Sequence, residues 1–493
     1  PSPFNMAAHV LAKADALADK VALSVLSCDG AQDWTYGQLS QAVRGIATGL
    51  LRAGFVPGDI LLMRLGNTPD FPLCYLGALA AGMVPVPTSA ALTAGEVTKI
   101  ITTLKPCAIL HDPAVPCPDF SAILNLSDLR AMWDLPPADW HMGDADRLGY
   151  IIYTSGTSGT PSAVMHGHRA IWARQMMFEG WYGLRQSDRL LHAGAFNWTY
   201  TLGTGLMDPW TMGATALIPA PGTAPGDIPA HLATHQATIF AAAPGVYRQV
   251  LKQHKLLDLP HLRHGLSAGE KLSPAVKTAW RDATGGNVYE AFGMSECSTF
   301  ISGSPANPAT DNALGRPQPG RQVAIIGDDG PLPAQTPGTI AIHRDDPGLM
   351  LGYLGAPELT TARYQGDWFM TGDQGVMDAS GQVTYLGRND DMMNAGGFRV
   401  SPLEVEAALA NAPDVETIGV CQVQVKPDVF VIAAFYTAAA SLDEDTLHRY
   451  AETKLARYKQ PRLYVHLPTL PMGANGKLLR RSLRATYEAK KHA

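Results

Sequence analysis

The sequence predicts an α/β fold, in which a large N-terminal region of layered, mainly parallel sheets with helices is followed by a small, mobile α+β C-terminal domain. With 493 residues, the chain is too long for a single compact core. Short apolar runs of strand character alternate with amphipathic stretches of helical spacing, which is typical of parallel sheets. The pattern changes near residue 388. We therefore expect one domain over residues 1–387 and a second over residues 388–493.

The first amphipathic helix is predicted between Thr35 and Gly54. Its apolar residues recur every three or four positions, and a glycine ends the pattern. The stretch from Phe71 to Val84 is predicted to be a buried helix. Further alternating elements are expected as strands at 59–65, 237–242, 265–268 and 287–292, and as helices at 246–251 and 274–283.

The C-terminal domain is predicted to begin after a turn over 381–391, where glycines and charged residues gather. Ser401 and Pro402 resemble a helix start, and Glu404 has the spacing that a capping box requires. Strands are expected at 418–425 and 429–436, followed by a helix over 442–458.

Composition and charge exclude several classes of function. The formal net charge is -6 and no long basic run occurs, so we expect no nucleic-acid partner. The longest apolar stretch, 71–84, is shorter than the roughly 18 residues that cross a bilayer, so we expect no membrane partner. The first residues lack a basic segment followed by an apolar one, and the six cysteines are scattered without zinc or disulfide spacing. These features favour a cytoplasmic protein with reduced thiols.

A loop of glycine and hydroxyl residues follows the strand-like Ile151–Tyr153. Small residues let backbone amides approach an anion, and hydroxyls add hydrogen-bond donors. The loop can therefore wrap a triphosphate, although a mobile surface loop has the same composition. Its candidate phosphate ligands are Thr154, Ser155, Gly156, Thr157, Ser158, Gly159 and Thr160.

The loop sequence Tyr-Thr-Ser-Gly-Thr-Ser-Gly-Thr-Pro resembles the signature of the adenylate-forming (AMP-binding) superfamily. That superfamily includes acyl-CoA synthetases, peptide-synthetase adenylation domains and luciferases. The resemblance implies binding of ATP with Mg²⁺. In the family a lysine usually follows the proline and holds the outer phosphates, whereas this chain has Ser162. We therefore expect pyrophosphate handling either to be weaker than in the family or to rely on another cation.

Two further motifs follow in the family's order. Ala268, Gly269 and Glu270 resemble the turn that lies against adenine in acetyl- and medium-chain acyl-CoA synthetases. The run from Tyr289 to Glu296 resembles the aromatic-Gly-x-Thr/Ser-Glu motif. In this motif Phe292 is expected to offer a ring face for adenine, and Gly293 to leave space. Ser295 is expected to supply a hydroxyl for phosphate, and Glu296 a hard oxygen ligand for Mg²⁺.

The remaining motifs fall near and beyond the predicted domain boundary. Asp373 resembles the aspartate that accepts hydrogen bonds from the ribose diol, and Arg388 resembles the arginine that reaches the ribose or phosphate. Asp390 matches the hinge between the domains. In the C-terminal domain, Gly397 and Arg399 are expected to bind coenzyme A, and Lys477 is expected to bridge the acid, the α-phosphate and the ribose. Surface ion pairs, an ordinary β-turn and a solvated terminal lysine are the structural alternatives.

The acid-binding segment is expected at Asn197, Trp198 and Thr199, which match the position of the family's acyl-pocket motif. Peptide-synthetase domains usually place an aspartate there to pair an amino acid's ammonium group. This chain has none, so the resemblance favours an uncharged acid, either aliphatic of short to medium length or aromatic. Core packing is the alternative function for Trp198.

Together the motifs imply an acid–thiol ligase. It would activate a carboxylic acid with ATP to an acyl-adenylate, release pyrophosphate, and transfer the acyl group to coenzyme A by domain alternation. Loading of a carrier protein's phosphopantetheine remains an alternative, as does a nucleotide-binding pseudoenzyme, because Ser162 replaces the lysine. A homodimer is left open.

Overall fold

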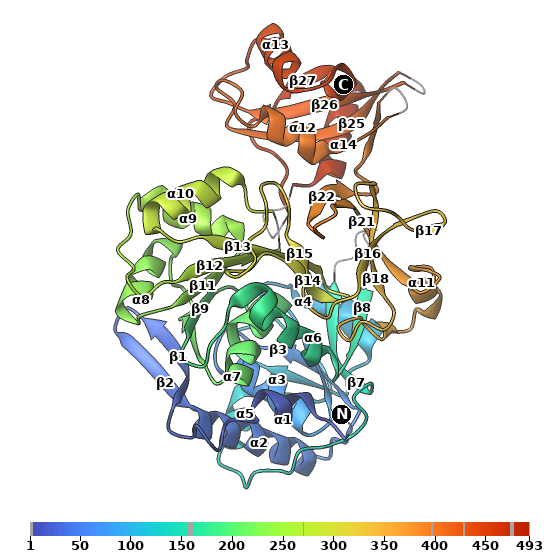
Figure 1. Ribbon diagram of the computed structural model, residues 1–493. Helices are drawn as coiled ribbons and strands as arrows, with labels where there is room; N and C mark the ends of the chain where they lie inside the picture. The colour runs from blue at the N-terminus through green and yellow to red at the C-terminus, as the bar shows by residue number, and fades with distance from the viewer. Residues whose placement is uncertain are drawn as a thin grey trace. The chain divides into compact units, whose positions relative to one another are not determined.

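The computed structural model describes residues 3–154, 162–269, 271–395, 398–426, 429–473 and 478–492, with backbone alone at 394–395, 398–399 and 490–492. Two compact units make up the chain (Figure 1). The large unit contains Pro1–Gln322 and Ile342–Trp368, and the small unit contains Val323–Ala341 and Phe369–Ala493. The small unit thus includes segments that precede residue 388. The division of the chain at 387/388 into two domains that move relative to each other stays a prediction.

A nine-stranded sheet forms the centre of the large unit. Its six middle strands are parallel, whereas both edges are antiparallel. In spatial order the strands are β15 (Arg316–Pro317), β14 (Ser298–Ser302), β13 (Val288–Met294), β12 (His264–Ala268), β11 (Ile239–Ala242), β9 (Arg189–Ala193), β10 (Thr215–Pro219), β1 (Val21–Ser27) and β2 (Gly30–Thr35).

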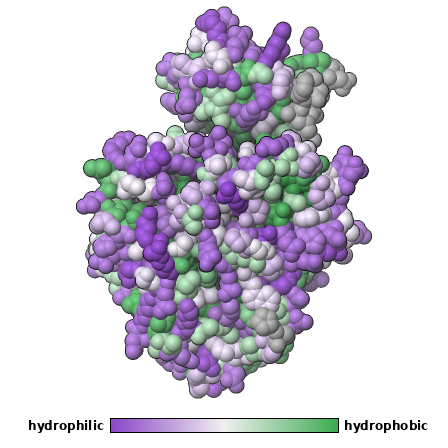
Figure 2. Space-filling view, in the orientation of Figure 1, coloured by the Kyte–Doolittle hydropathy of each residue, from purple (hydrophilic) through white to green (hydrophobic). Residues whose placement is uncertain are grey.

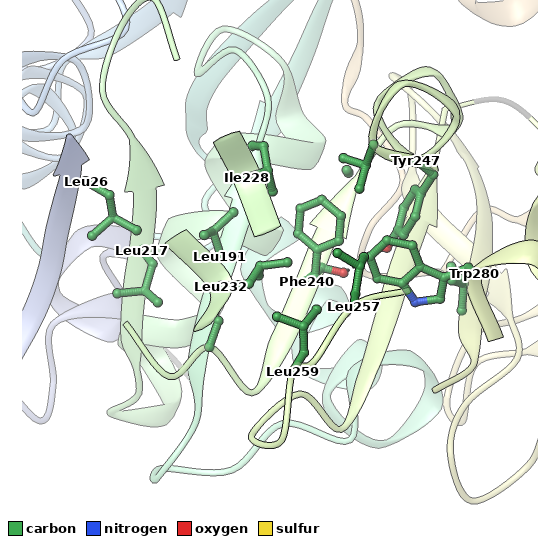
Figure 3. Packing of buried hydrophobic residues seen from close by; sticks show 14 of the residues in the cluster. Leu26, Leu191, Leu217, Ile228, Leu232, Phe240, Tyr247, Leu257, Leu259 and Trp280 are labelled. Carbon is green, nitrogen blue, oxygen red and sulfur yellow. Dashed lines mark hydrogen bonds between the residues drawn. The ribbon is translucent and has the colours of Figure 1, made fainter. Parts of the chain in front are cut away.

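Helices cover both faces of this sheet, because neighbouring residues of one strand point to opposite sides. Leu191 and Phe240 pack with the helices α8 (Ile228–Thr234), α9 (Pro244–Gln253) and α10 (Pro274–Thr284), and Figure 3 shows Trp280 and Tyr247 closing over Phe240. The adjacent Leu190 and Ile239 pack on the other side. That second face is covered by α6 (Ala170–Met177), η1 (Phe178–Tyr182) and η2 (Tyr200–Met207).

Two smaller sheets complete the large unit. The first is fully parallel and contains β4 (Val84–Pro87), β3 (Ile60–Arg64), β5 (Ala108–His111) and β6 (Ile123–Asn125). The second is antiparallel and contains β19 (Gly352–Tyr353), β8 (Ser162–Gly167) and β7 (Leu148–Thr154). The remaining helices are α1 (Met6–Val10), α2 (Tyr36–Arg52), α3 (Asp70–Ala80), α4 (Ala94–Leu104), α5 (Leu126–Ala131), α7 (Asp208–Met212), η3 (Pro225–Asp227) and α11 (Pro357–Thr361).

The small unit combines mainly antiparallel strands with helices. Its first sheet contains β17 (Gly330–Pro331), β16 (Val323–Gly327), β18 (Gly338–His343), β21 (Trp368–Met377) and β22 (Val383–Arg388), where β18 and β21 each extend slightly beyond the unit. A second sheet, β25 (Thr417–Lys426), β26 (Val429–Thr437) and β27 (Leu463–His466), packs with α12 (Pro402–Leu409), α13 (Glu444–Lys454) and α14 (Arg480–His492). In this second sheet β25 and β26 are antiparallel, whereas β26 and β27 are parallel. The strands β23 (Met393–Ala395) and β24 (Phe398–Val400) form a hairpin, and η4 (Arg457–Lys459) is a short 3-10 turn.

The layered α/β architecture predicted from the sequence is confirmed. Thr35 caps α2 in a capping box with Gln38, and every residue of α3 is buried.

Four local predictions were wrong. The buried helix expected over 71–84 ends at Ala80, and β4 begins at Val84. The turn expected over 381–391 contains the strand β22. The helix expected over 442–458 ends at Lys454, because Leu455 is extended. Ser401 caps α12 as predicted, but the side chain of Glu404 pairs with Lys459 instead of completing a capping box.

The surface carries scattered apolar residues. Figure 2 shows mainly hydrophilic side chains on the viewed face of each unit, with small hydrophobic areas between them. Within the ranges that the structure covers, no helix has the length and apolar character needed to cross a lipid bilayer.

Candidate active site

The sheet topology of the large unit creates a switch point at the carboxyl end of β9. β10 pairs on one side of β9, whereas the next strand along the chain, β11, pairs on the other side. Ligands of open α/β sheets bind at such a switch point, outside the carboxyl ends of the strands. The segment 197–199 follows β9, Gly269 follows β12, and Ser295 follows β13. Three motifs that lie far apart in the sequence therefore meet at one edge of the sheet.

Trp198 and Gly269 are in close contact at this edge. Gly269 has a φ of +97°, and a Cβ atom there would lie 2.6 Å from Cζ2 of Trp198. Only glycine fits both the backbone conformation and the indole ring. Trp198 is half-buried and also meets Tyr200 edge-on at 5.1 Å. The indole thus packs against the core on one side and borders the expected adenine turn on the other.

A small cavity lies behind Thr199 and Ser295. These two residues and Ser298 are half-buried, whereas the other lining residues are buried, so the cavity extends inward from the sheet edge. Its one cation, Arg174, pairs with Asp208 at 2.7 Å. The cavity therefore has no uncompensated charge. The residues that line it are Tyr75, Tyr150, His166, Arg174, Thr199, Leu202, Met207, Ser295 and Ser298.

The turn that contains Ser295 and Glu296 is held by hydrogen bonds to its backbone. His166 Nε2 donates to the Ser295 carbonyl at 2.7 Å, because a carbonyl oxygen can only accept. Burial lowers the pKa of His166 to about 4, so its ring is neutral near pH 7. The Met350 amide donates to the Glu296 carbonyl at 2.8 Å, and Arg321 donates to the Cys297 carbonyl at 3.1 Å. The turn is thus positioned in advance of any ligand.

The carboxylate of Glu296 is only partly engaged. Its Oε1 accepts a hydrogen bond from the Tyr353 hydroxyl at 2.7 Å, and Nη1 of Arg363 lies 3.9 Å away. Its Oε2 makes no hydrogen bond within the part of the chain that the structure describes. Mg²⁺ prefers hard oxygen ligands and often uses one or two carboxylates together with substrate phosphates. The donor chemistry of Glu296 therefore fits the predicted Mg²⁺ ligand. Among the described residues no group of three or more metal-ligating side chains gathers.

Phe292 and Gly293 shape the strand before this turn. The ring of Phe292 is half-buried and meets Phe300 edge-on at 5.4 Å. A Cβ atom at Gly293 would lie 2.3 Å from the Ser298 carbonyl oxygen, because β14 folds back closely along β13. The need for glycine at this position is therefore structural, and contacts of Phe292 with adenine stay a prediction.

The predicted phosphate loop connects two paired strand ends. Thr154 at the end of β7 pairs with Ser162 at the start of β8, and its hydroxyl donates to the Ser162 carbonyl at 3.4 Å. Ala268 is buried at the end of β12. The predicted ligands Ser155, Gly156, Thr157, Ser158, Gly159, Thr160 and Glu270 lie outside the described residues.

Asp373 and Arg388 face each other across the β21–β22 hairpin of the small unit. The two residues are direct partners in the register, with Nη1 of Arg388 3.6 Å from Oδ1 of Asp373. The Tyr385 hydroxyl donates to the same oxygen at 3.0 Å. Burial opposes the charge of Arg388, but Asp373 and Asp390 raise its pKa above the usual value. Sequence analysis missed Tyr385, because regular strand alternation places it on the face opposite to Arg388. The register shift between β21 and β22 brings it to Asp373.

Asp390 lies in the exposed turn after β22, with Oδ1 3.6 Å from Nε of Arg388. Gly397, Lys477 and the side chain of Arg399 lie outside the described part of the chain. Arg480, three residues after Lys477, is firmly held: Nη2 donates to both carboxylate oxygens of Glu406 at 2.7 Å. The residue that follows the lysine segment is thus anchored in the small unit.

Comparison with known proteins points in one direction. The AMP-binding enzyme family matches residues 11–354, and the AMP-binding enzyme C-terminal domain matches residues 404–477. The chain is 30% identical to the mitochondrial acyl-coenzyme A synthetase ACSM5 of Mus musculus, over 92% of this chain and 84% of that protein. It is 28% identical to the 3-hydroxybenzoate–CoA ligase of Aromatoleum sp. (strain CIB), over 97% of this chain and 95% of that protein. The crystal structure of a benzoate CoA ligase from Burkholderia xenovorans LB400 superimposes with a TM-score of 0.85 at 26% identity, covering 98% of this chain and all of that one.

Proposed function

The chain belongs to the AMP-binding enzyme family and is an AMP-forming acyl-CoA ligase, and we propose that it activates an uncharged carboxylic acid with ATP and transfers the acyl group to coenzyme A. The observation that carries this proposal is the meeting of three motifs at the carboxyl edge of the nine-stranded sheet, where Trp198 contacts Gly269 and the Ser295–Glu296 turn lies next along the edge.

The first reaction would form an acyl-adenylate. A carboxylate oxygen of the acid bonds to the α-phosphorus of ATP, and the bond from that phosphorus to the pyrophosphate oxygen breaks. Both reactants are anionic, so the step needs fixed positive charge and donors where negative charge develops. Lys477 and the loop hydroxyls of 154–160 would supply donors. Glu296 would hold Mg²⁺, which neutralises polyphosphate charge when bound.

The second reaction would release AMP. The thiol sulfur of coenzyme A bonds to the acyl carbon, the bond to the adenylate oxygen breaks, and the thiol proton leaves to solvent. We assign Gly397 and Arg399 to the coenzyme A side and Asp390 to the hinge. A rotation there would withdraw Lys477 after the first reaction and present the thiol-binding face for the second.

The substrate class follows from the segment after β9. Asn197, Trp198 and Thr199 carry no charge, and the cavity behind Thr199 has its one cation neutralised by Asp208. This favours an acid without an ammonium group, either aliphatic of short to medium length or aromatic. The relative from Aromatoleum is named for an aromatic acid, which supports the aromatic alternative.

The test is a panel of aliphatic and aromatic acids, assayed for AMP release with and without coenzyme A. We expect AMP release to depend on an acid and to increase when coenzyme A is added, together with formation of an acyl-CoA thioester. Thioester formation only on a phosphopantetheinylated carrier protein would instead identify a carrier-loading enzyme. No AMP release with any acid would contradict the proposal.

A further inference from the structure

The loop expected to bind the triphosphate has no cationic side chain of its own. From Thr154 to Ser162 the sequence contains hydroxyl residues, glycines and a proline, but no lysine, arginine or histidine. Departure of pyrophosphate places additional negative charge on the leaving oxygen, and enzymes stabilise such charge with fixed cations. A cation from another described segment of the large unit could supply this charge if it lies close to the ends of the loop.

The strand β19 brings such a segment to the base of the loop. Tyr353 of β19 pairs with Val164 of β8, and the Leu354 amide donates to the Ala163 carbonyl at 2.9 Å. Ala163 directly follows Ser162. The chain then forms α11, whose Thr360 hydroxyl accepts a hydrogen bond from the Tyr353 amide at 2.9 Å. This bond fixes the end of α11 against β19, just before Arg363.

Arg363 is positioned beside Glu296 through Tyr353. Its Nη1 donates to the Tyr353 hydroxyl oxygen at 3.1 Å, and that hydroxyl donates to Oε1 of Glu296 at 2.7 Å. The direct distance from Nη1 to Oε1 is 3.9 Å. Charge-assisted arginine–carboxylate pairs are usually bidentate and close at about 2.7–2.9 Å. The Arg363–Glu296 pair is therefore long, so the guanidinium lies beside the carboxylate without closing onto it.

The surroundings of Arg363 also suit a multiply charged ligand. Its side chain is 25% exposed and that of Glu296 is 13% exposed, so both are reachable at the surface of the large unit. A guanidinium presents a planar fork of donors that matches phosphate oxygens. With Mg²⁺ on Glu296, a polyphosphate would meet a metal ion and a guanidinium side by side.

We propose that Arg363 binds the outer phosphates of ATP and stabilises the leaving pyrophosphate, in place of a cation within the loop. This inference rests on the proposed function. When the bond between the α-phosphorus and its bridging oxygen breaks, the electron pair stays on that oxygen, and Arg363 neutralises part of the resulting charge. Tyr353 orients the guanidinium and keeps Oε2 of Glu296 available for the metal ion.

Calorimetry with inorganic pyrophosphate and Mg²⁺ tests this assignment without requiring turnover. We expect Arg363→Ala to weaken pyrophosphate binding about 10- to 100-fold, because a charge-assisted contact contributes about 1.5–3 kcal/mol. Arg363→Lys should retain part of the affinity. The matched control is Arg344→Ala, which removes an exposed arginine of the same unit that pairs with Asp367 at 2.9 Å. It should change the affinity less than twofold.

A second variant separates a charge effect from a structural one. Ser162→Lys places a cation at the base of the loop. In the Arg363→Ala background it should restore most of the lost affinity for pyrophosphate. If Arg363→Ala weakened binding through a packing defect, an added cation would not restore the affinity. Unchanged binding in Arg363→Ala, equal losses in Arg344→Ala, or no restoration by Ser162→Lys would each overturn the assignment. If pyrophosphate binding depends on Arg363 but no acid supports AMP release, the proposed function and the role of Arg363 in catalysis fail, while its role in phosphate binding stands.

Discussion

The two units support their candidate site residues by different means. In the large unit, the Ser295–Glu296 turn is held through its backbone carbonyls by His166, Arg321 and the amide of Met350. In the small unit, Asp373 and Arg388 hold each other across one hairpin, and Asp390 is exposed in the turn that follows. The turn of the large unit is therefore fixed by surrounding backbone contacts, whereas the candidate residues of the small unit are positioned mainly by one another.

Removal of Lys477 should give the largest effect. If the small unit delivers this ammonium group to the adenylation step, Lys477→Ala should lower the rate of adenylation about 10²- to 10³-fold, the usual loss when one preorganised donor is removed. Thioester formation from supplied acyl-adenylate, followed by chromatography, should stay close to the wild-type rate. Equal losses in both reactions would contradict a role confined to the first.

The Glu296 carboxylate tests the large unit in the same way. Glu296→Gln keeps an oxygen acceptor for Tyr353 but removes the charge expected to bind Mg²⁺. We expect kcat/KM for ATP to fall about 10²-fold, with part of the loss recovered at high Mg²⁺ concentration. The exposed Glu179→Gln serves as the control. A Mg²⁺ titration identical to that of the wild type would exclude the metal role.

Acid should destabilise the large unit through its buried histidines. Burial lowers the pKa of His166 to about 4 and that of His192 to about 3. Protonation then favours the unfolded chain, in which histidine has a pKa near 6.5. The stabilisation from keeping each ring neutral is therefore fully present well above pH 6.5. The free energy of unfolding falls as the pH decreases from 6.5 toward the pKa values of the folded protein, by roughly 2 kcal/mol per histidine at pH 5.

Tryptophan fluorescence can follow this effect in one unit, because all nine tryptophans belong to the large unit. Urea unfolding at pH 7 and pH 5 should show a clear loss of stability in the fluorescence signal. His192→Gln should reduce the difference between the two pH values. A midpoint independent of pH would show that these rings are not buried in neutral form.

Loss of the Asp373 charge should have a smaller effect. In Asp373→Asn one carboxylate acceptor for the ribose diol becomes an amide, so we expect KM for ATP to rise about tenfold with kcat nearly unchanged. The exposed Asp445→Asn is the control within the same unit. A fall in kcat without a change in KM would argue that Asp373 acts on chemistry and not on nucleotide binding.

Sequence patterns predicted the layered fold because strand alternation, helix caps and glycines are local signals. Thr35 with Gln38 and the buried run of α3 are examples. The end of α13 at Lys454 was missed, since the following Leu455 is buried in an extended conformation, and burial in a core is set by tertiary packing.

The candidate site was only partly predictable. Motif residues such as Ser295 and Trp198 could be found from the sequence, but their supports could not. His166 of β8 and Arg321, which follows β15, are distant from the Ser295 turn in sequence, and only the tertiary fold brings them to it. Arg363 was missed for the same reason, because the pairing of β19 with β8 carries it to Glu296.

Acid-dependent exchange of labelled pyrophosphate into ATP tests the central claim most directly, because it reports acyl-adenylate formation alone. We predict exchange that requires an acid and Mg²⁺, that proceeds without coenzyme A, and that falls about 10²- to 10³-fold in Lys477→Ala. Absence of exchange in the wild-type protein with every aliphatic and aromatic acid tried would contradict the account.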